Sequence, residues 1–125
     1  MVNQMSGETV LVVEDEILIR FDIVDALTDA GFIVLEAGNV AEAVAILGAT
    51  PDIRAVFTDV DMPGAENGLD LAQKVHASRP PVAVLVTSGH RRVTEADLPE
   101  DGRFLPKPYR PSQVIANLNE MVRAA

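Results

Sequence analysis

Carboxylate, hydroxyl and amine side chains follow the apolar runs of this chain, at Glu14, Asp15, Asp59, Thr87 and Lys107. If the three carboxylates converge, two charges about 4 Å apart repel by about 4 kcal/mol at an effective dielectric of about 20. A shared proton, the ammonium of Lys107 or a hard cation such as Mg²⁺ can relieve this repulsion. A carboxylate beside Mg²⁺, a lysine and a hydroxyl has the groups that phosphoryl transfer requires, because the carboxylate attacks in line while the others hold the equatorial oxygens.

Five apolar runs predict the strands that position these residues, at residues 10–13, 32–35, 55–57, 82–86 and 104–105. The first and fourth runs are continuous and rich in β-branched residues, which is typical of strands buried on both faces of a parallel sheet. Ligand sites in such sheets form at the carboxyl ends of the strands, where the residues named above stand. Pro106 has no N–H for a sheet ladder, so the last strand is expected at an edge.

Helical spacing of apolar residues lies between the runs. Residues 16–30 form one such pattern, Asn39 and Asn67 are candidate caps of two more helices, and Pro111 is placed to begin the last. From Gly89 to Gly102 the pattern is weak, so we expect a short or distorted fourth helix there. The alternation predicts an α/β fold, a parallel sheet with helices on both faces joined by right-handed crossovers.

Composition bounds the class of protein. The chain has 125 residues, enough for one domain, which we place at residues 9–125 after a flexible polar tail at residues 1–8. It has no cysteine, which excludes disulfides, Fe–S clusters and cysteine nucleophiles. A net charge of -9 argues against nucleic-acid binding. No apolar run reaches the roughly 20 residues of a bilayer span. We therefore predict a cytoplasmic protein with no membrane and no nucleic-acid partner.

Four motifs together resemble the receiver domain of two-component response regulators. They are residues 10–16 (VLVVEDE), 56–64 (VFTDVDMPG), 84–88 (VLVTS) and 104–109 (FLPKPY). Each motif alone is weak, but the four stand in the family's order across nearly the whole chain. The resemblance implies a doubly wound, flavodoxin-like sheet of five parallel strands in the order 2-1-3-4-5.

The resemblance also implies a role for each site residue. Asp59 is the phospho-acceptor, and Thr87 and Lys107 bind the phosphoryl oxygens. The metal ligands are Asp15, Asp59, the backbone carbonyl of Asp61 and, through water, Glu14, for Mg²⁺ with Mn²⁺ as the alternative. Thr87 and Phe104 form the conformational switch, and the Lys107–Pro108 bond is cis.

These roles lead us to predict a stand-alone, single-domain response regulator, monomeric or weakly dimeric. It receives a phosphoryl group on Asp59 from a histidine kinase or a histidine phosphotransfer protein. It then signals through an unknown downstream protein or passes the group along a phosphorelay. It is not an enzyme, apart from its self-phosphorylation and autodephosphorylation.

Two other functions are open to the same residues. Asp59 and Asp61 also look like the two-aspartate motif of haloacid-dehalogenase-like phosphatases, in which the second aspartate is a general acid. A degenerate receiver that binds partners without phosphorylation is the other. Simpler structural roles are also open to some of these residues. Phe104 fits a plain core position, and the Asp61 side chain fits a solvated group. Ile17, Phe21 and Val24 fit an overflow of the core as well as a docking patch for a kinase's helical bundle.

Overall fold

The computed structural model describes residues 7–124 and shows alternating strands and helices. The strands are β1 (Thr9–Val13), β2 (Ile33–Ala37), β3 (Ile53–Asp59), β4 (Ala83–Ser88) and β5 (Arg103–Pro106). The helices are α1 (Ile17–Asp29), α2 (Val40–Ala49), α3 (Gly68–Ser78) and α4 (Pro111–Ala124). Every predicted strand is present, and the three helices expected before residue 89 and the one beginning at Pro111 are found where the apolar spacing placed them.

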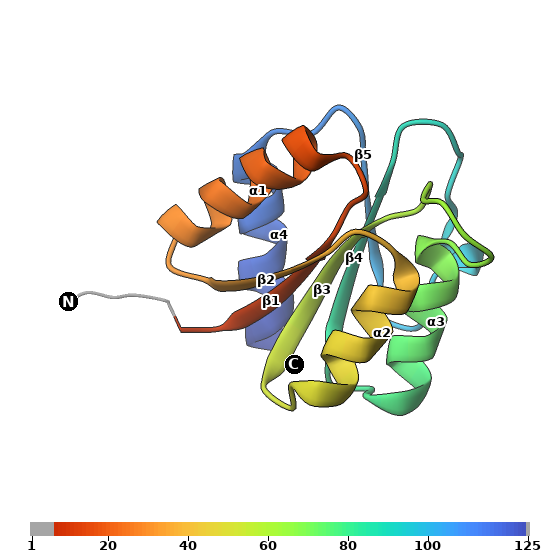
Figure 1. Cartoon of the computed structure of the whole chain (residues 1–125), viewed down its shortest axis with the longest axis horizontal. Coiled ribbons are helices and arrows are strands. Elements are labelled where there is room, and N and C mark those ends of the chain that lie inside the picture. The colour runs from red at the N-terminus through yellow and green to blue at the C-terminus, as the bar shows by residue number, and fades with distance from the viewer. Residues whose placement is uncertain (1–6, 125) are drawn as a thin grey trace.

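The strands form one parallel sheet in the order β2-β1-β3-β4-β5. Helices α1 and α4 cover one face, and α2 and α3 cover the other (Figure 1). The predicted doubly wound, flavodoxin-like fold and its strand order are therefore confirmed. Strand β5 lies at an edge, as the missing N–H of Pro106 predicted.

Two apolar clusters, one on each face of the sheet, explain the sequence pattern. Successive residues of β1 alternate between the clusters, with Val10 and Val12 in one and Leu11 and Val13 in the other. Every residue of β1 is buried, which is why its sequence is continuously apolar instead of alternating. The edge strand β2 has exposed positions, including Ile33.

Asparagine caps fix where two helices begin. The side chain of Asn39 accepts a hydrogen bond from the Glu42 N–H at the start of α2. Asn67 accepts from the N–H groups of Leu69 and Asp70, and the Asp70 carboxylate accepts from the Asn67 N–H in return. This reciprocal capping box holds the first turn of α3.

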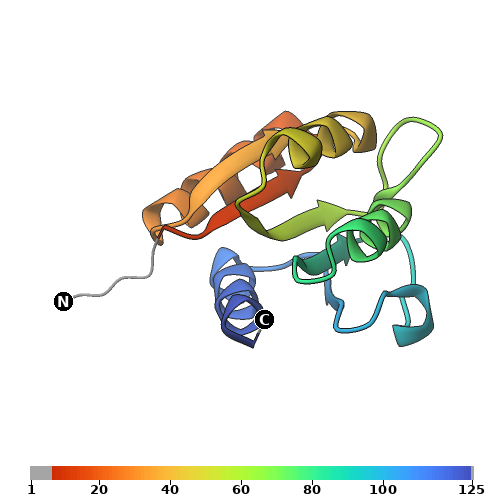
Figure 2. The same cartoon turned by 90° about the horizontal axis from the view of Figure 1, so that it is seen from below.

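The connection between β4 and β5 contains no α-helix. Residues 89–102 form a loop with one short 3-10 helix, η1 (Glu95–Asp97), beside α3 (Figure 2). This confirms the expectation of a short or distorted fourth helix. Of the predicted tail, residues 1–6 lie outside the described residues. Among the helices that are described, none has both the length and the apolar character needed to cross a membrane.

Candidate functional site

The parallel register brings the predicted site residues to one edge of the sheet. Asp59 is the last residue of β3, and its partner in the ladder is Thr87 near the end of β4. Glu14 and Asp15 follow β1 directly, and Lys107 follows β5. All five side chains therefore stand at the carboxyl ends of adjacent strands, where open α/β sheets form their ligand sites.

Three carboxylates converge at this edge. Glu14, Asp15 and Asp59 each offer one oxygen, and these three oxygens lie within 4.8 Å of one another. Glu14 and Asp59 are almost fully buried, at 3% and 4% exposed, whereas Asp15 is the least buried of the three. Burial raises the pKa of Asp59 although Lys107 opposes the shift, and burial also raises the pKa of Glu14. The cluster is therefore costly when all its members are ionised.

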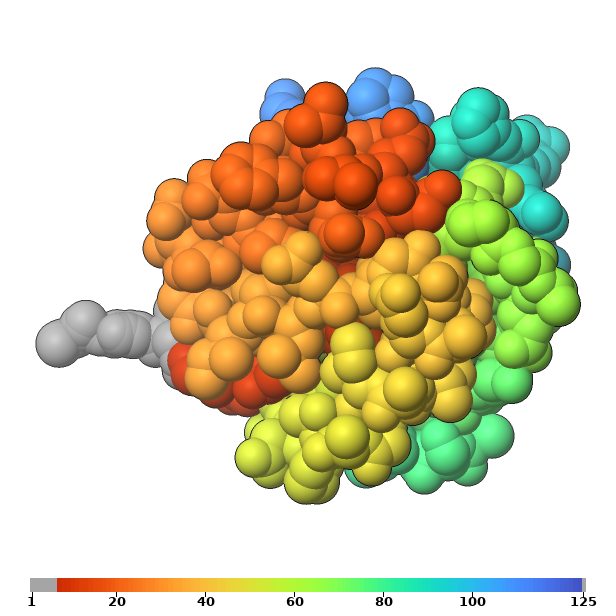
Figure 3. Space-filling model, viewed as in Figure 1, coloured from red at the N-terminus to blue at the C-terminus, as the bar shows by residue number. Residues whose placement is uncertain are grey.

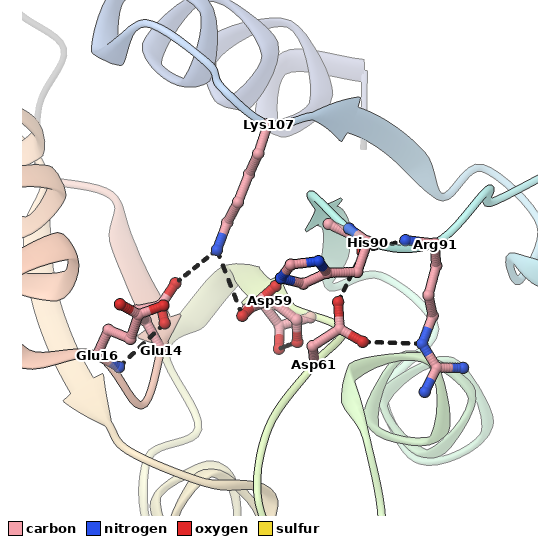
Figure 4. A network of polar contacts seen from close by, with 9 residues as sticks. Glu14, Glu16, Asp59, Asp61, His90, Arg91 and Lys107 are labelled. Atoms are coloured by element: carbon pink, nitrogen blue, oxygen red, sulfur yellow. Dashed lines mark hydrogen bonds and ion pairs between the residues drawn. The ribbon is translucent and has the colours of Figure 1, made fainter.

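Lys107 bridges two of the carboxylates. Its Nζ atom lies 3.4 Å from Glu14 Oε1 and 3.4 Å from Asp59 Oδ2 (Figure 4). Burial lowers the pKa of Lys107, but the charges of Asp59 and Glu14 outweigh it, so the pKa is raised overall. The ammonium therefore stays charged and offsets part of the repulsion within the cluster.

The residues that follow Lys107 hold its segment in place. The Lys107–Pro108 bond is cis, as the family resemblance implied. Tyr109, the next residue, packs edge-on against Phe57 with the ring centres 5.5 Å apart. Burial, together with the charges of Glu14, Asp59 and Asp22, raises the pKa of Tyr109 to about 12.

Two oxygens in the pocket have no hydrogen-bond partner within the described residues. They are Asp59 Oδ1 and Thr87 Oγ1, and both are buried. Buried polar atoms without partners are rare in folded proteins and need an explanation. A hard cation held by the carboxylates fits Asp59 Oδ1, since Mg²⁺ prefers carboxylate oxygens. A phosphoryl oxygen fits the Thr87 hydroxyl, which has a proton to donate.

Asp61 lies beside the pocket, but its carboxylate is engaged elsewhere. Oδ2 accepts a hydrogen bond of 2.8 Å from the Ser88 hydroxyl, and Oδ1 accepts one of 2.9 Å from Arg91 Nε. Partial burial raises the pKa of Asp61, but these two donors outweigh it and leave the pKa below its usual value. Both carboxylate oxygens of Asp61 therefore act as acceptors here, whereas the phosphatase alternative assigns this aspartate the role of a general acid.

Phe104 lies outside this pocket. It is the ladder partner of Val86 and packs half-buried against the apolar cluster beneath α2 and α3, which Val93 and Leu98 also cover. On the opposite face, Val24 packs against the other cluster. Ile17 and Phe21 are exposed on α1, at 70% and 65%, together with Leu18.

Sequence reasoning did not identify three contributors to this region. A Cβ atom at Gly68 would lie 2.0 Å from the Asp59 carbonyl oxygen, so the glycine lets α3 begin against the backbone of the candidate acceptor. Ser88 and Arg91 hold the Asp61 carboxylate from 27 and 30 residues away along the chain. No local motif marks such contacts.

Comparisons with known proteins agree with this architecture. The family model for the response regulator receiver domain matches residues 10–119. The chain is 34% identical to the chemotaxis protein CheY of Thermotoga maritima over 120 residues, covering 92% of this chain and 98% of CheY. A response regulator receiver protein from Sinorhizobium medicae has a similar structure, with a TM-score of 0.88 and 28% identity, covering 94% of this chain and 96% of that one.

Longer proteins also contain a similar region. The chain is 37% identical over 125 residues to the sensor kinase CckA of Brucella abortus, covering 94% of this chain but only 13% of that kinase. It spans 53% of the phosphate regulon transcriptional regulatory protein PhoB of Pseudomonas aeruginosa, with 30% identity. The similarity therefore concerns one region of these larger proteins.

Proposed function

Because this chain belongs to the response regulator receiver domain family, we propose that residues 9–125 form a phospho-acceptor switch with Asp59 as the acceptor. The donor is a phosphohistidine on a histidine kinase or a histidine phosphotransfer protein. The phosphorylated chain signals through a downstream protein or a phosphorelay. Turnover of an outside metabolite is not part of this function.

One observation carries the proposal. Asp59 and Thr87 are partners in the sheet register, and each has a buried oxygen without a hydrogen-bond partner in the described part of the chain. Lys107 approaches Asp59 from a third strand end. A phosphoryl group on Asp59 supplies an acceptor for the Thr87 hydroxyl, which has none within the described residues, and places negative charge beside the Lys107 ammonium.

In the transfer, a carboxylate oxygen of Asp59 attacks phosphorus. The P–O bond forms as the P–N bond to the donor histidine breaks, and the released imidazole nitrogen takes a proton from solvent. Thr87 and Lys107 bind the phosphoryl oxygens throughout. The oxygens of Glu14, Asp15, Asp59 and the Asp61 backbone carbonyl are the groups that would hold Mg²⁺, or Mn²⁺ in its place. When bound, the metal neutralises charge on the phosphoryl group.

The switch in this proposal is a coupled movement of Thr87 and Phe104. Drawing the Thr87 hydroxyl toward a phosphoryl oxygen shifts the end of β4. Phe104 is the ladder partner of the preceding residue, Val86, and still has part of its ring exposed. The proposed switch therefore turns this ring further inward when Thr87 moves.

A partner surface lies next to the site on α1. Ile17, Leu18 and Phe21 are exposed, at 70%, 79% and 65%. The start of α1, the segment after β4 and the segment before α4 surround the same end of the molecule (Figure 3). We propose that this apolar patch contacts the helical bundle of the phosphodonor, since helix-to-helix contacts use residues at this spacing.

Mass spectrometry of the intact protein tests the central proposal. The chain is incubated with Mg²⁺ and a small acyl phosphate such as acetyl phosphate. We expect a gain of one phosphoryl group, and we expect hydroxylamine to remove it because Asp59 would carry an acyl phosphate. Omitting Mg²⁺ by adding a chelator should abolish the gain.

Two aspartate variants provide the control. Asp59→Asn should gain no phosphoryl group. Asp52→Asn, an equivalent change at an exposed position just before the opposite end of β3, should gain it as the parent does. No gain in the parent chain would favour the degenerate receiver, and equal gains in both variants would place the acceptor elsewhere.

A further inference from the structure

A second polar network lies beside the acidic pocket and uses none of the groups assigned to the phosphoryl transfer itself. The Asp61 carboxylate accepts a hydrogen bond from Ser88 Oγ at 2.8 Å. It accepts another from Arg91 Nε at 2.9 Å (Figure 4). Ser88 Oγ in turn accepts from the backbone N–H groups of Arg91, at 3.1 Å, and His90, at 3.3 Å. We call the group formed by Asp61, Ser88 and Arg91 the latch.

The latch joins the two segments that carry the reacting residues. Asp61 is two residues after Asp59, and Ser88 is the residue after Thr87. Because the latch lies between these two segments, the loop after β4 cannot move away from the pocket without breaking a contact to Asp61. Ser88 is buried at 2% exposed, so its hydroxyl needs this partner.

The loop has another contact at the pocket. Gly89 lies against the stem of Lys107, where a Cβ atom would meet Lys107 Cβ at 3.4 Å. The start of the loop therefore stands between the latch on one side and Lys107 on the other. Figure 4 shows the His90 ring above Asp59, between Lys107 and Asp61.

Beyond Arg91, few regular contacts hold this connection. In the described residues its one helix is η1, of three residues, and the hydrogen bond from Gln73 of α3 to Asp97 is long, at 3.5 Å. Val93 and Leu98 add partly buried apolar contacts. At the pocket end of this connection, the polar contacts that hold it are therefore those of the latch.

From this arrangement we infer that the latch controls access to Asp59, and that Arg91 is a positioning residue for the reaction. The inference rests on the proposed phosphorylation of Asp59. With the latch closed, the residues after Thr87 cover the pocket. With it open, water reaches the phosphorus, the P–O bond to Asp59 breaks, and phosphate leaves with the protons of the water while Asp59 returns as a carboxylate.

The experiment uses the whole chain with Arg91→Ala, Arg91→Lys and Arg92→Ala. Arg92 is the adjacent exposed arginine, and the described residues show no ion pair for it. Amide hydrogen exchange of residues 88–93 is measured before phosphorylation. The lifetime of the phosphoryl group is then measured by intact mass after acetyl phosphate is removed.

We expect Arg91→Ala to raise the exchange rate and to shorten the phosphoryl lifetime, each by about fivefold, as the loss of a partly exposed ion pair allows. Arg91→Lys should restore most of both values, since it retains the charge, and Arg92→Ala should change neither. Faster exchange with an unchanged lifetime would overturn the inference, as would identical behaviour of Arg91→Ala and Arg92→Ala. If the parent chain takes no phosphoryl group, the proposed function fails, while unchanged exchange in Arg91→Ala refutes the latch separately.

Discussion

The two connections that flank the pocket are held in different ways. After β3, the chain enters α3 through Gly68, whose N–H donates to the Val60 carbonyl, and the capping box of Asn67 and Asp70 closes the first turn. After β4, residues 89–102 form only η1, and their fastening at the pocket comes from Asp61 on another strand end.

This difference separates a fixed side of the site from an adjustable one. The β3–α3 junction rests on a backbone hydrogen bond and a capping box between residues close in sequence, and the helix it starts buries Leu71, Ala72 and Val75. Such contacts are lost only when much of the domain unfolds. The β4–β5 connection depends at the pocket on the ion pair of Arg91 with Asp61, whose side chains are partly exposed, and such a pair opens at low cost. The acceptor therefore lies on the fixed side and Thr87 beside the adjustable one.

Substitution of Gly68 is the most severe test of the fixed side. A Cβ atom at this position would lie 2.0 Å from the Asp59 carbonyl oxygen and 2.8 Å from its carbon. Since both are backbone atoms, the helix or the strand must shift. We expect Gly68→Ala to lower the free energy of unfolding by about 3 kcal/mol, measured by urea denaturation.

Gly48→Ala is the matched control for this change. Gly48 lies in α2, and a Cβ atom there meets nothing within 4 Å. We expect this variant to gain about 0.5 kcal/mol from the lower backbone entropy of alanine. If Gly68→Ala unfolds at the same urea concentration as the parent, the β3–α3 junction is not the close contact that distinguishes this side.

Removing the charge of Asp59 also tests the fixed side, but this substitution is expected to stabilise the protein. The Asp59 carboxylate is buried beside Glu14 and Asp15, and a rigid junction cannot move its charge toward water, whereas asparagine carries no charge. We expect Asp59→Asn to raise the free energy of unfolding of the metal-free protein by about 1 kcal/mol at pH 7. Urea denaturation in a chelator, with Asp52→Asn as the control, measures this gain.

The raised pKa values predict how the stability gain of Asp59→Asn changes with pH. Burial raises the pKa of both Asp59 and Glu14 in the folded protein. A raised carboxyl pKa contributes stability that is present below the unfolded value, 3.8 for Asp59 and 4.5 for Glu14, and is lost as pH rises through the folded value. The advantage of Asp59→Asn should therefore shrink as the pH falls from 7 toward the unfolded value of 3.8, and Mg²⁺ should reduce it throughout this range. An advantage that grows on acidification would contradict this account.

The difference between local contacts and contacts of distant residues also separates what the sequence could predict from what it could not. The continuous apolar residues of β1 and β4, the caps Asn39 and Asn67, and the edge position implied by Pro106 are local signals, and each was found in the structure. Because parallel strands bring their carboxyl ends to one edge, these strands also predicted that Glu14, Asp15, Asp59, Thr87 and Lys107 would lie together. Most of the fold and the members of the pocket followed from such patterns.

Contacts between distant residues could not be predicted in this way. The Asp61 side chain was equally consistent with solvent exposure, because Ser88 and Arg91 reach it across 27 and 30 residues. The fit of Gly68 against Asp59 depends on how closely α3 approaches β3. Val24 fitted both an overflow of the core and a docking patch on α1, and the packing of α1 on the sheet brings it against the core.

Two aspartates in equivalent positions provide the finest comparison of the two sides. Asp70 accepts the N–H of Asn67 at the start of α3, at 2.8 Å, and Asp97 accepts the N–H of Thr94 at the start of η1, at 2.9 Å. Both side chains are exposed, so replacement by alanine removes the same kind of hydrogen bond in each. We expect Asp70→Ala to lower the free energy of unfolding by about 1 kcal/mol, since α3 forms with the fold.

For Asp97→Ala we expect a loss of only about 0.3 kcal/mol, because a segment that opens locally contributes little to global unfolding. Its effect should instead appear in hydrogen exchange, as faster exchange confined to residues 94–98, whereas Asp70→Ala should affect exchange throughout α3. Urea denaturation and exchange on the same two variants measure both quantities. Equal losses in global stability would show that the β4–β5 connection unfolds only together with the sheet, and an adjustable side of the pocket would then have no physical basis.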